Sequence, residues 1–182
     1  MQPYPLSSYG EVIAACQEVF RQKNEDYGTA WRILRLPAIT DQIMIKAQRI
    51  RSIQEKGQQC VQDSIKTELI GIVNYGIIAL IQISLPPHEP LEIPYETLQP
   101  CYDQAAKQTL ALLEAKNHDY DEAWRAMRLS SIIDIILMKL LRIKRIEDHP
   151  GATWASEGVE ANYQDIINYA VFALLKKKDG HE

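Results

Sequence analysis

An internal repeat is the feature that most restricts the folds open to this chain of 182 residues. Residues 23–53 align with residues 116–146 without a gap at an offset of 93, and 16 of the 31 aligned pairs are identical. The match resumes after one inserted residue, where Asn74-Tyr75 aligns with Asn168-Tyr169. A self-match of this length indicates two copies of one structural unit. The predicted domains are residues 1–84 for helical repeat 1, 85–96 for a proline-rich linker and 97–182 for helical repeat 2.

Both copies have the apolar spacing of helices, and neither contains a run that alternates between apolar and polar residues as a half-buried strand does. Pro37 is expected to end a short helix that carries Trp31, and Thr40 to cap the long helix that follows. In the first copy we expect a helix from about residue 8 to residue 23, a break over residues 24–28, a short helix around 31–35, a long helix over 40–57 and a fourth over about 61–84. In the second copy the expected helices cover 100–115, 122–129, 131–148 and about 157–178. The predicted fold class is all-α, a tandem duplication of a four-helix unit packed as a pseudo-two-fold helical bundle.

The composition argues against membrane and nucleic-acid partners. The longest apolar run, residues 69–85, contains Asn74 and Gln82, and its counterpart in the second copy carries Asp165, so a buried core helix is expected rather than a membrane span. The net charge of −4 argues against a nucleic-acid clamp, which depends on Lys and Arg. The first residues lack the pattern of a targeting segment, and the three Cys lack metal or disulfide spacing, so we expect buried thiols and a cytoplasmic protein.

Basic residues are kept at matched positions of the two copies, although a helical scaffold needs only its apolar face. Arg32 with Arg35, and Lys46 with Arg49, are spaced so that each pair lies on one helix face. Guanidinium and ammonium groups suit phosphate, and a neighbouring Trp suits a base. The alternatives are a solvated face, ion pairs between helices, and a core Trp. The predicted ligand- or phosphate-binding residues are Lys23, Trp31, Arg32, Arg35, Lys46, Arg49, Lys116, Trp124, Arg125, Arg128, Lys139 and Arg142.

Carboxylates of the repeat suggest a divalent metal. Asp26 and Asp119 are expected at a helix junction, either as helix caps or as metal ligands. Glu68 aligns with Asn162 and Gly71 aligns with Asp165, so neither copy has both carboxylates. Mg²⁺ prefers oxygen ligands, which leaves a composite site, a lost site or solvated carboxylates as alternatives. The predicted metal ligands are Asp26, Glu68, Asp119 and Asp165, with Mg²⁺ as the expected cofactor.

Two further polar pairs recur in the alignment. Asp41 and Asp134 lie at the start of matching helices, where an acid suits the helix dipole or an ion pair. Asn74 and Asn168 lie in apolar helices, and a buried Asn must be hydrogen-bonded. Each Asn is therefore expected either to tie two helices together or to contact a ligand.

The strings KNxDYGxAW and DQIxIKAxRI, followed by a helix with Glu and Asn-Tyr, resemble the nucleotide modification associated domain 1 family, over about residues 20–80 and 113–175. More distantly, the chain is similar to MazG-like all-α nucleoside triphosphate pyrophosphatases. That resemblance implies Mg²⁺ held by acidic helix residues and a water that attacks between phosphates. The E-E-x-x-E run of that group is absent here.

These observations lead to two hypotheses on function. The first is a nucleotide-binding protein, with Mg²⁺-dependent pyrophosphohydrolysis of a nucleoside phosphate as the candidate reaction and no catalytic residue assigned. The alternative is a non-catalytic helical binding or assembly module, in which the repeated charges are structural ion pairs. The expected partner is a small anionic ligand, and a homodimer is left open.

Overall fold

The computed structural model describes residues 6–57, 64–86, 88–120, 123–151 and 158–178, with the backbone alone for residues 6, 7, 64 and 117–120. This part of the chain contains α-helices and short 3-10 helices and no strand, which confirms the all-α prediction. The elements are α1 (Leu6–Tyr27), η1 (Ala30–Ile33), α2 (Leu36–Lys56), α3 (Ser64–Ser84), α4 (Tyr95–Tyr120), η2 (Ala123–Ala126), α5 (Leu129–Asp148) and α6 (Val159–Lys178).

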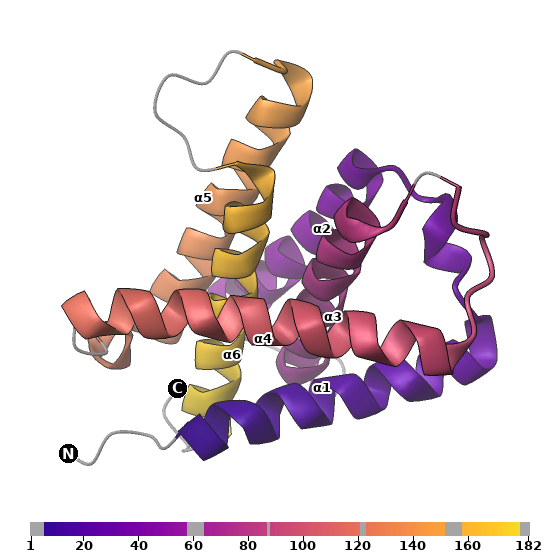
Figure 1. The fold of residues 1–182 in the computed structure, drawn as a ribbon. Helices are drawn as coiled ribbons and strands as arrows, with labels where there is room; N and C mark the ends of the chain where they lie inside the picture. Colours follow the sequence, from indigo (N-terminus) through magenta and orange to yellow (C-terminus); the bar gives the residue numbers. More distant parts are fainter. Residues whose placement is uncertain (1–5, 58–63, 87, 121–122, 152–157, 179–182) are drawn as a thin grey trace.

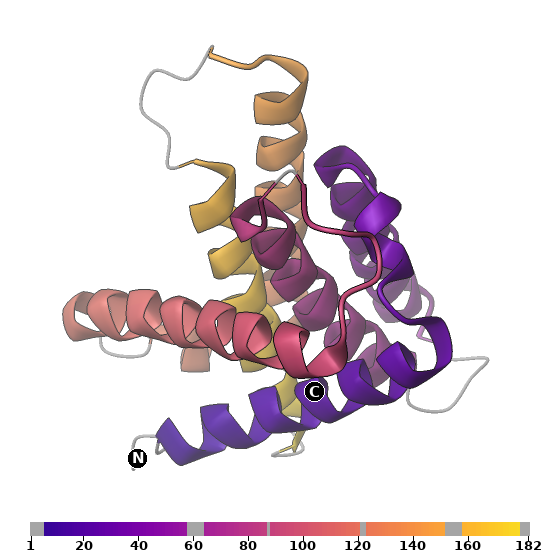
Figure 2. The same cartoon turned by 45° about the vertical axis from the view of Figure 1, so that its right-hand side comes forward.

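The two repeats share one core. Helices α2 and α3 of the first repeat pack against each other and against α5 and α6 of the second. Helices α1 and α4 run side by side in opposite directions across the other four (Figure 1, Figure 2). Each of these two crossing helices contacts both α3 and α6, so neither repeat buries its apolar residues alone.

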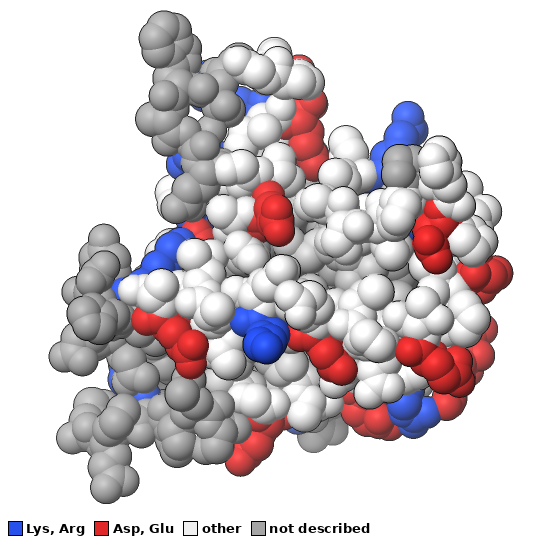
Figure 3. All heavy atoms as spheres, in the orientation of Figure 1, with Lys and Arg blue, Asp and Glu red and all other residues white. Residues whose placement is uncertain are grey.

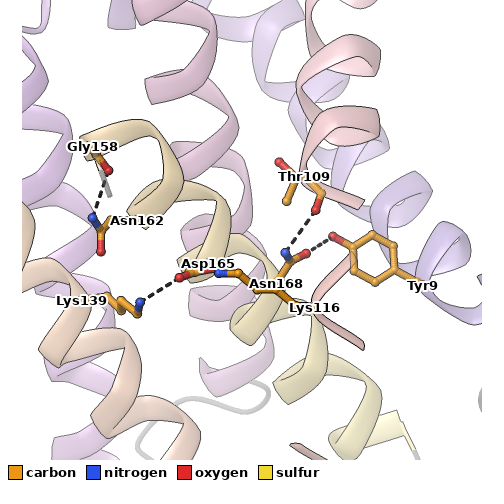
Figure 4. A network of polar contacts seen from close by, with 8 residues as sticks. All are labelled: Tyr9, Thr109, Lys116, Lys139, Gly158, Asn162, Asp165 and Asn168. Atoms are coloured by element: carbon orange, nitrogen blue, oxygen red, sulfur yellow. Dashed lines mark hydrogen bonds and ion pairs between the residues drawn. The ribbon is translucent and has the colours of Figure 1, made fainter. Parts of the chain in front are cut away.

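Buried hydrogen bonds join the repeats in a reciprocal way. The hydroxyl of Tyr9 in α1 donates to Oδ1 of Asn168 at 2.6 Å, and Nδ2 of Asn168 donates to the backbone carbonyl of Thr109 at 3.2 Å (Figure 4). In the mirrored arrangement, Tyr102 donates to Oδ1 of Asn74 at 2.8 Å, and Nδ2 of Asn74 donates to a carbonyl of α1 at 2.9 Å. Both Asn side chains therefore tie helices of the two repeats together, as one of the two sequence alternatives predicts.

A second reciprocal set lies on the surface between α2 and α5. Asp41 of α2 pairs with Lys144 of α5, and Asp134 of α5 lies 3.6 Å from Arg51 of α2. Lys144 aligns with Arg51 in the repeat, so the same ion pair forms twice across the pseudo-two-fold axis. These two acids have a structural role, which agrees with the ion-pair interpretation.

The prediction that Pro37 ends a helix is wrong. Helix α2 begins at Leu36, with Arg35 as N-cap and Pro37 in its first positions. A proline is tolerated there because the first N–H groups of a helix have no intrahelical partner. Thr40 is consequently not a cap; it is buried inside α2 and its hydroxyl donates to the carbonyl of Leu36 at 3.1 Å.

The break expected from residue 24 onward is also placed too early. Helix α1 continues to Tyr27 and ends at Gly28, whose φ of +56° is readily adopted by glycine and whose N–H donates to the carbonyl of Asn24 at 2.8 Å. Asp26 therefore lies in the last turn of α1 and is no N-cap. Helix α4 likewise begins at Tyr95, ahead of the predicted residue 100 and inside the predicted linker.

Helix α3 is the most apolar segment of the described chain. Its stretch Ile65–Ser84 is long and apolar enough to cross a membrane by length and composition, and 61% of that window is buried among the other helices. Gly76 lets α6 approach closely, since a Cβ there would lie 2.6 Å from Cγ1 of Ile167. This packing favours the core-helix interpretation.

Charged side chains are dispersed on the face drawn in Figure 3. Acidic residues are spread over it, and basic ones do not gather into a patch. A nucleic-acid clamp would require clustered Lys and Arg. This face offers no such cluster, and the expectation against nucleic acid stays a prediction.

Candidate functional site

A cavity of about 490 Å³ opens in the first repeat, between the end of α1, η1, α2 and α3. This volume is within the range of ordinary ligand pockets, about 300–1,000 Å³. The lining is largely apolar and aromatic. The polar and aromatic side chains in the wall are Phe20, Lys23, Asn24, Tyr27, Trp31, Lys46, Thr67, Asn74 and Tyr75. We call this space the first-repeat cavity.

Two lysines from different helices face the first-repeat cavity. Lys46 of α2 has its Nζ 3.3 Å from Oε2 of Glu68 and 5.8 Å from the centre of the Tyr75 ring. The other oxygen of Glu68 accepts a hydrogen bond from Arg49. Lys23 of α1 is exposed, and no ion pair or hydrogen bond joins its ammonium group to another described residue. The cavity wall thus carries one neutralised cation and one cation without a described counter-charge.

A polar atom in this wall has no described partner. Oδ1 of Asn24 is buried, and no described residue donates a hydrogen bond to it. A buried carbonyl without a donor costs free energy, so such an atom requires an explanation. Asn24 lines the cavity, so rotation of its side chain would bring this oxygen to an N–H or O–H of a ligand there. Trp31 and Tyr75, only partly buried, supply aromatic surface in the same wall.

In the second repeat, the residues that match the cavity wall contact other side chains of the protein. Oδ1 of Asp165 accepts a hydrogen bond from Lys116 at 2.6 Å, and Oδ2 accepts one from Lys139 at 2.8 Å (Figure 4). The side chain of Asp165 is only 7% exposed. Trp124 is buried and stacks on Phe172, with ring centres 4.2 Å apart and planes 2° from parallel. Protein side chains therefore provide both the anion and the aromatic ring in this repeat.

The predicted arginines lie elsewhere. Arg32 donates to Oε1 of Gln82 at 2.6 Å and to the carbonyl of Glu89 at 3.0 Å, so it ties η1 to α3 and to the linker. Arg125 lies over the Trp124 ring at 5.0 Å. The remaining predicted arginines have exposed side chains that do not line the cavity, namely Arg35, Arg49, Arg128 and Arg142. Of the predicted ligand-binding residues, the cavity brings together Lys23, Trp31 and Lys46.

The described carboxylates do not fit a magnesium centre. Asp26 is exposed, while Glu68 and Asp165 hold Lys and Arg groups that neutralise them. The side chain of Asp119 lies outside the described part of the chain. Over the described residues, no group of three or more His, Cys, Asp or Glu could hold a metal ion. Magnesium therefore stays a prediction from the sequence.

Sequence reasoning missed the residues that open the first-repeat cavity. Gly71 and Ile78 line it, whereas the aligned positions of the second repeat are Asp165 and Phe172. The identical pairs of the repeat directed attention to shared residues. The signal that locates the cavity is instead a difference between the copies, namely a smaller residue in the first copy than at the aligned position of the second.

A separate polar cluster joins α2, α5 and α6. Oε1 of Glu147 lies 2.9 Å from the hydroxyl of Thr40 and 3.4 Å from that of Tyr163, and the two hydroxyls lie 2.6 Å apart. Burial raises the pKa of Glu147 above its ordinary value, although these hydrogen bonds act in the opposite direction. This cluster lies between the repeats and is not part of the cavity wall.

Fold and cavity define a class, namely a small all-α protein of two fused repeats with a ligand-sized cavity in the first. The sequence model of nucleotide modification associated domain 1 matches residues 23–83 and 116–176. The chain belongs to that family, with one domain copy in each repeat. Comparisons with curated proteins and with solved structures find no match. The more distant likeness to MazG-like enzymes stays a prediction.

Proposed function

We propose that the first-repeat cavity binds a nucleotide. The observation that carries the proposal is the convergence of Lys23, Trp31 and Lys46 on one cavity of about 490 Å³, beside the unpartnered carbonyl of Asn24. The aromatic surface suits a flat base, and the cations suit phosphate. The acceptor suits a hydrogen-bond donor on the edge of the base.

The aromatic wall supports the base part of the proposal. Trp31 and Tyr75 are partly buried and line the cavity, so a ring could stack there without unfolding the core. Stacking of a base on an aromatic side chain contributes about 1–3 kcal/mol. After rotation of the Asn24 side chain, its Oδ1 would accept a hydrogen bond from an amino or imino group of that base.

The cations support the phosphate part. Lys46 lies at the cavity wall with its charge partly used by Glu68, and Lys23 has no described counter-charge. A lysine binds phosphate as a point charge, and hydrogen bonds between ionised groups are stronger than neutral ones. The family description, nucleotide modification associated domain, is consistent with this ligand class.

The alternative of a purely structural module has specific support for some residues. Asp41, Asp134, Asn74 and Asn168 make contacts between helices of the two repeats. Their repetition therefore has a structural reason. Lys23 of the cavity wall does not share this explanation, because it pairs with nothing described.

The proposal is restricted to binding. The described carboxylates supply no metal-binding group, and no nucleophile or general base is identified in the cavity wall. Pyrophosphohydrolysis with Mg²⁺ stays a hypothesis that the binding experiment also addresses.

Thermal unfolding with a panel of nucleoside mono-, di- and triphosphates, each with and without Mg²⁺, tests the proposal. A ligand that binds only the folded state at 100 times its Kd stabilises it by about 2.7 kcal/mol, so a binder should raise Tm measurably. Lys23→Met should reduce this rise, whereas Lys107→Met, which replaces an exposed lysine of α4 outside the cavity, should leave it unchanged. No rise with any nucleotide at millimolar concentration would refute nucleotide binding.

A further inference from the structure

The lysine pairs of the two repeats have different surroundings. Lys116 and Lys139 enclose the carboxylate of Asp165, with contacts of 2.6 and 2.8 Å (Figure 4). The aligned residues of the first repeat are Lys23 and Lys46, and both line the first-repeat cavity. The second repeat therefore shows where an anion lies when it is held by this pair of lysines.

The difference arises from the position of one carboxylate along the last helix of each repeat. Glu68 lies three residues before Gly71, which is about 4.5 Å along the helix axis. In the first repeat this carboxylate pairs with Lys46 and Arg49. Asp165 aligns with Gly71, one turn further along, where it reaches Lys116 as well.

Gly71 has no side chain, and the stem of Lys46 packs where its Cβ would lie. A Cβ on Gly71 would lie 2.8 Å from Cε and 3.2 Å from Nζ of Lys46, so the ammonium group lies beside this position. Nothing described in the first repeat places a carboxylate between Lys46 and Lys23. An anionic ligand group in the cavity could lie between these two ammonium groups, as the carboxylate of Asp165 lies between Lys116 and Lys139 in the second repeat.

The contacts of the matched tryptophans, Trp31 and Trp124, also differ between the two repeats. Phe172 stacks on Trp124 in the second repeat, whereas its aligned residue Ile78 lines the first-repeat cavity beside Trp31. The first-repeat cavity thus lacks two groups that the second repeat has, namely the ring of Phe172 and the carboxylate of Asp165.

We propose that, of the two matched lysine pairs, the pair in the second repeat is occupied by Asp165 of the chain itself, and the pair in the first-repeat cavity takes a ligand with a flat ring and a compact anionic group. The ring packs on Trp31 and the anion lies between Lys23 and Lys46. This inference rests on the proposed function for the identity of the ligand as a nucleotide, but the anion position follows from the repeat alone.

Calorimetric titration tests this inference with AMP and, separately, with inorganic phosphate as the probes. The wild type is compared with E68N/G71D, which reproduces the second-repeat arrangement, and with G71A, which adds volume without charge. Gly71 has no positive φ, so both replacements suit a helix, and the flexible end of Lys46 can move aside. Circular dichroism confirms that each variant is folded.

The expected result is one AMP per chain, an affinity at least about tenfold weaker in E68N/G71D, and a smaller change in G71A. Two AMP per chain, or equal affinity in wild type and E68N/G71D, would overturn the inference and leave nucleotide binding intact. If AMP fails to bind but phosphate binds the wild type and not E68N/G71D, the anion position is supported and the ring part of the inference fails. If neither probe binds the wild type, the inference fails, and the nucleotide panel decides the proposed function separately.

Discussion

Replacing Asp165 by Asn should destabilise the protein more than the same change at an exposed ion pair. The carboxylate is 7% exposed and accepts hydrogen bonds from Lys116 and Lys139, whose side chains are 37% and 19% exposed. A hydrogen bond to a charged group contributes about 1.5–3 kcal/mol. Water around the half-exposed Lys116 reduces its share, so we expect a loss of about 2–3 kcal/mol in the free energy of unfolding.

Urea unfolding followed by circular dichroism measures this loss. The matching drop in Tm is about 4–12 °C, at about 2–4 °C per kcal/mol for a chain of this size. Asp41→Asn is the control, because Asp41 and its partner Lys144 are 55% and 40% exposed and the pair should contribute less than about 1 kcal/mol. A cost for Asp165→Asn that equals the cost of the control would refute the argument that Asp165 is a buried internal anion.

Three further predictions concern groups outside the cavity. Tyr102→Phe leaves the side-chain carbonyl of buried Asn74 without its donor and should lower the free energy of unfolding in urea by about 1–3 kcal/mol. A loss near zero would contradict a stabilising hydrogen bond between Tyr102 and Asn74. The pKa of Glu147 is raised in the folded state, which therefore binds the proton more tightly than the unfolded state. The stability of the wild type should consequently fall, relative to Glu147→Gln, as pH rises from about 4 to 7, and parallel pH profiles would contradict this. Burial raises the pKa of Cys16 to about 12, so in a Cys60→Ser background its thiol should react with a disulfide reagent far more slowly than that of Cys101, and equal rates would contradict its burial.

The fold class followed from sequence because its signals are local or internal to the chain. Helical spacing of apolar residues and the match between residues 23–53 and 116–146 need no knowledge of packing. Pro37 begins a helix where the sequence predicts the end of one, because a proline can both terminate one helix and begin the next. The path of the chain on either side decides between these roles, and it depends on tertiary contacts.

The candidate site was only partly predictable for a different reason. Identity between the two copies is the signal that predicts three residues of the site, namely Lys23, Trp31 and Lys46. Their different surroundings in the two repeats depend on Gly71 and Ile78, which matter through the space they leave rather than through chemistry of their own. Space between helices is a property of packing, so it becomes visible only when the helices are assembled.

Fluorescence of Trp31 tests the central claim, ligand binding in the first-repeat cavity, most directly. A W124F/W154F variant retains Trp31 as its one tryptophan, and this indole lines the cavity. Titration with AMP should change its emission along a saturable curve, whereas a W31F/W154F variant, which reports on Trp124 stacked against Phe172, should stay constant. Unchanged emission of Trp31 at millimolar AMP, or a response from Trp124 instead, would contradict the account.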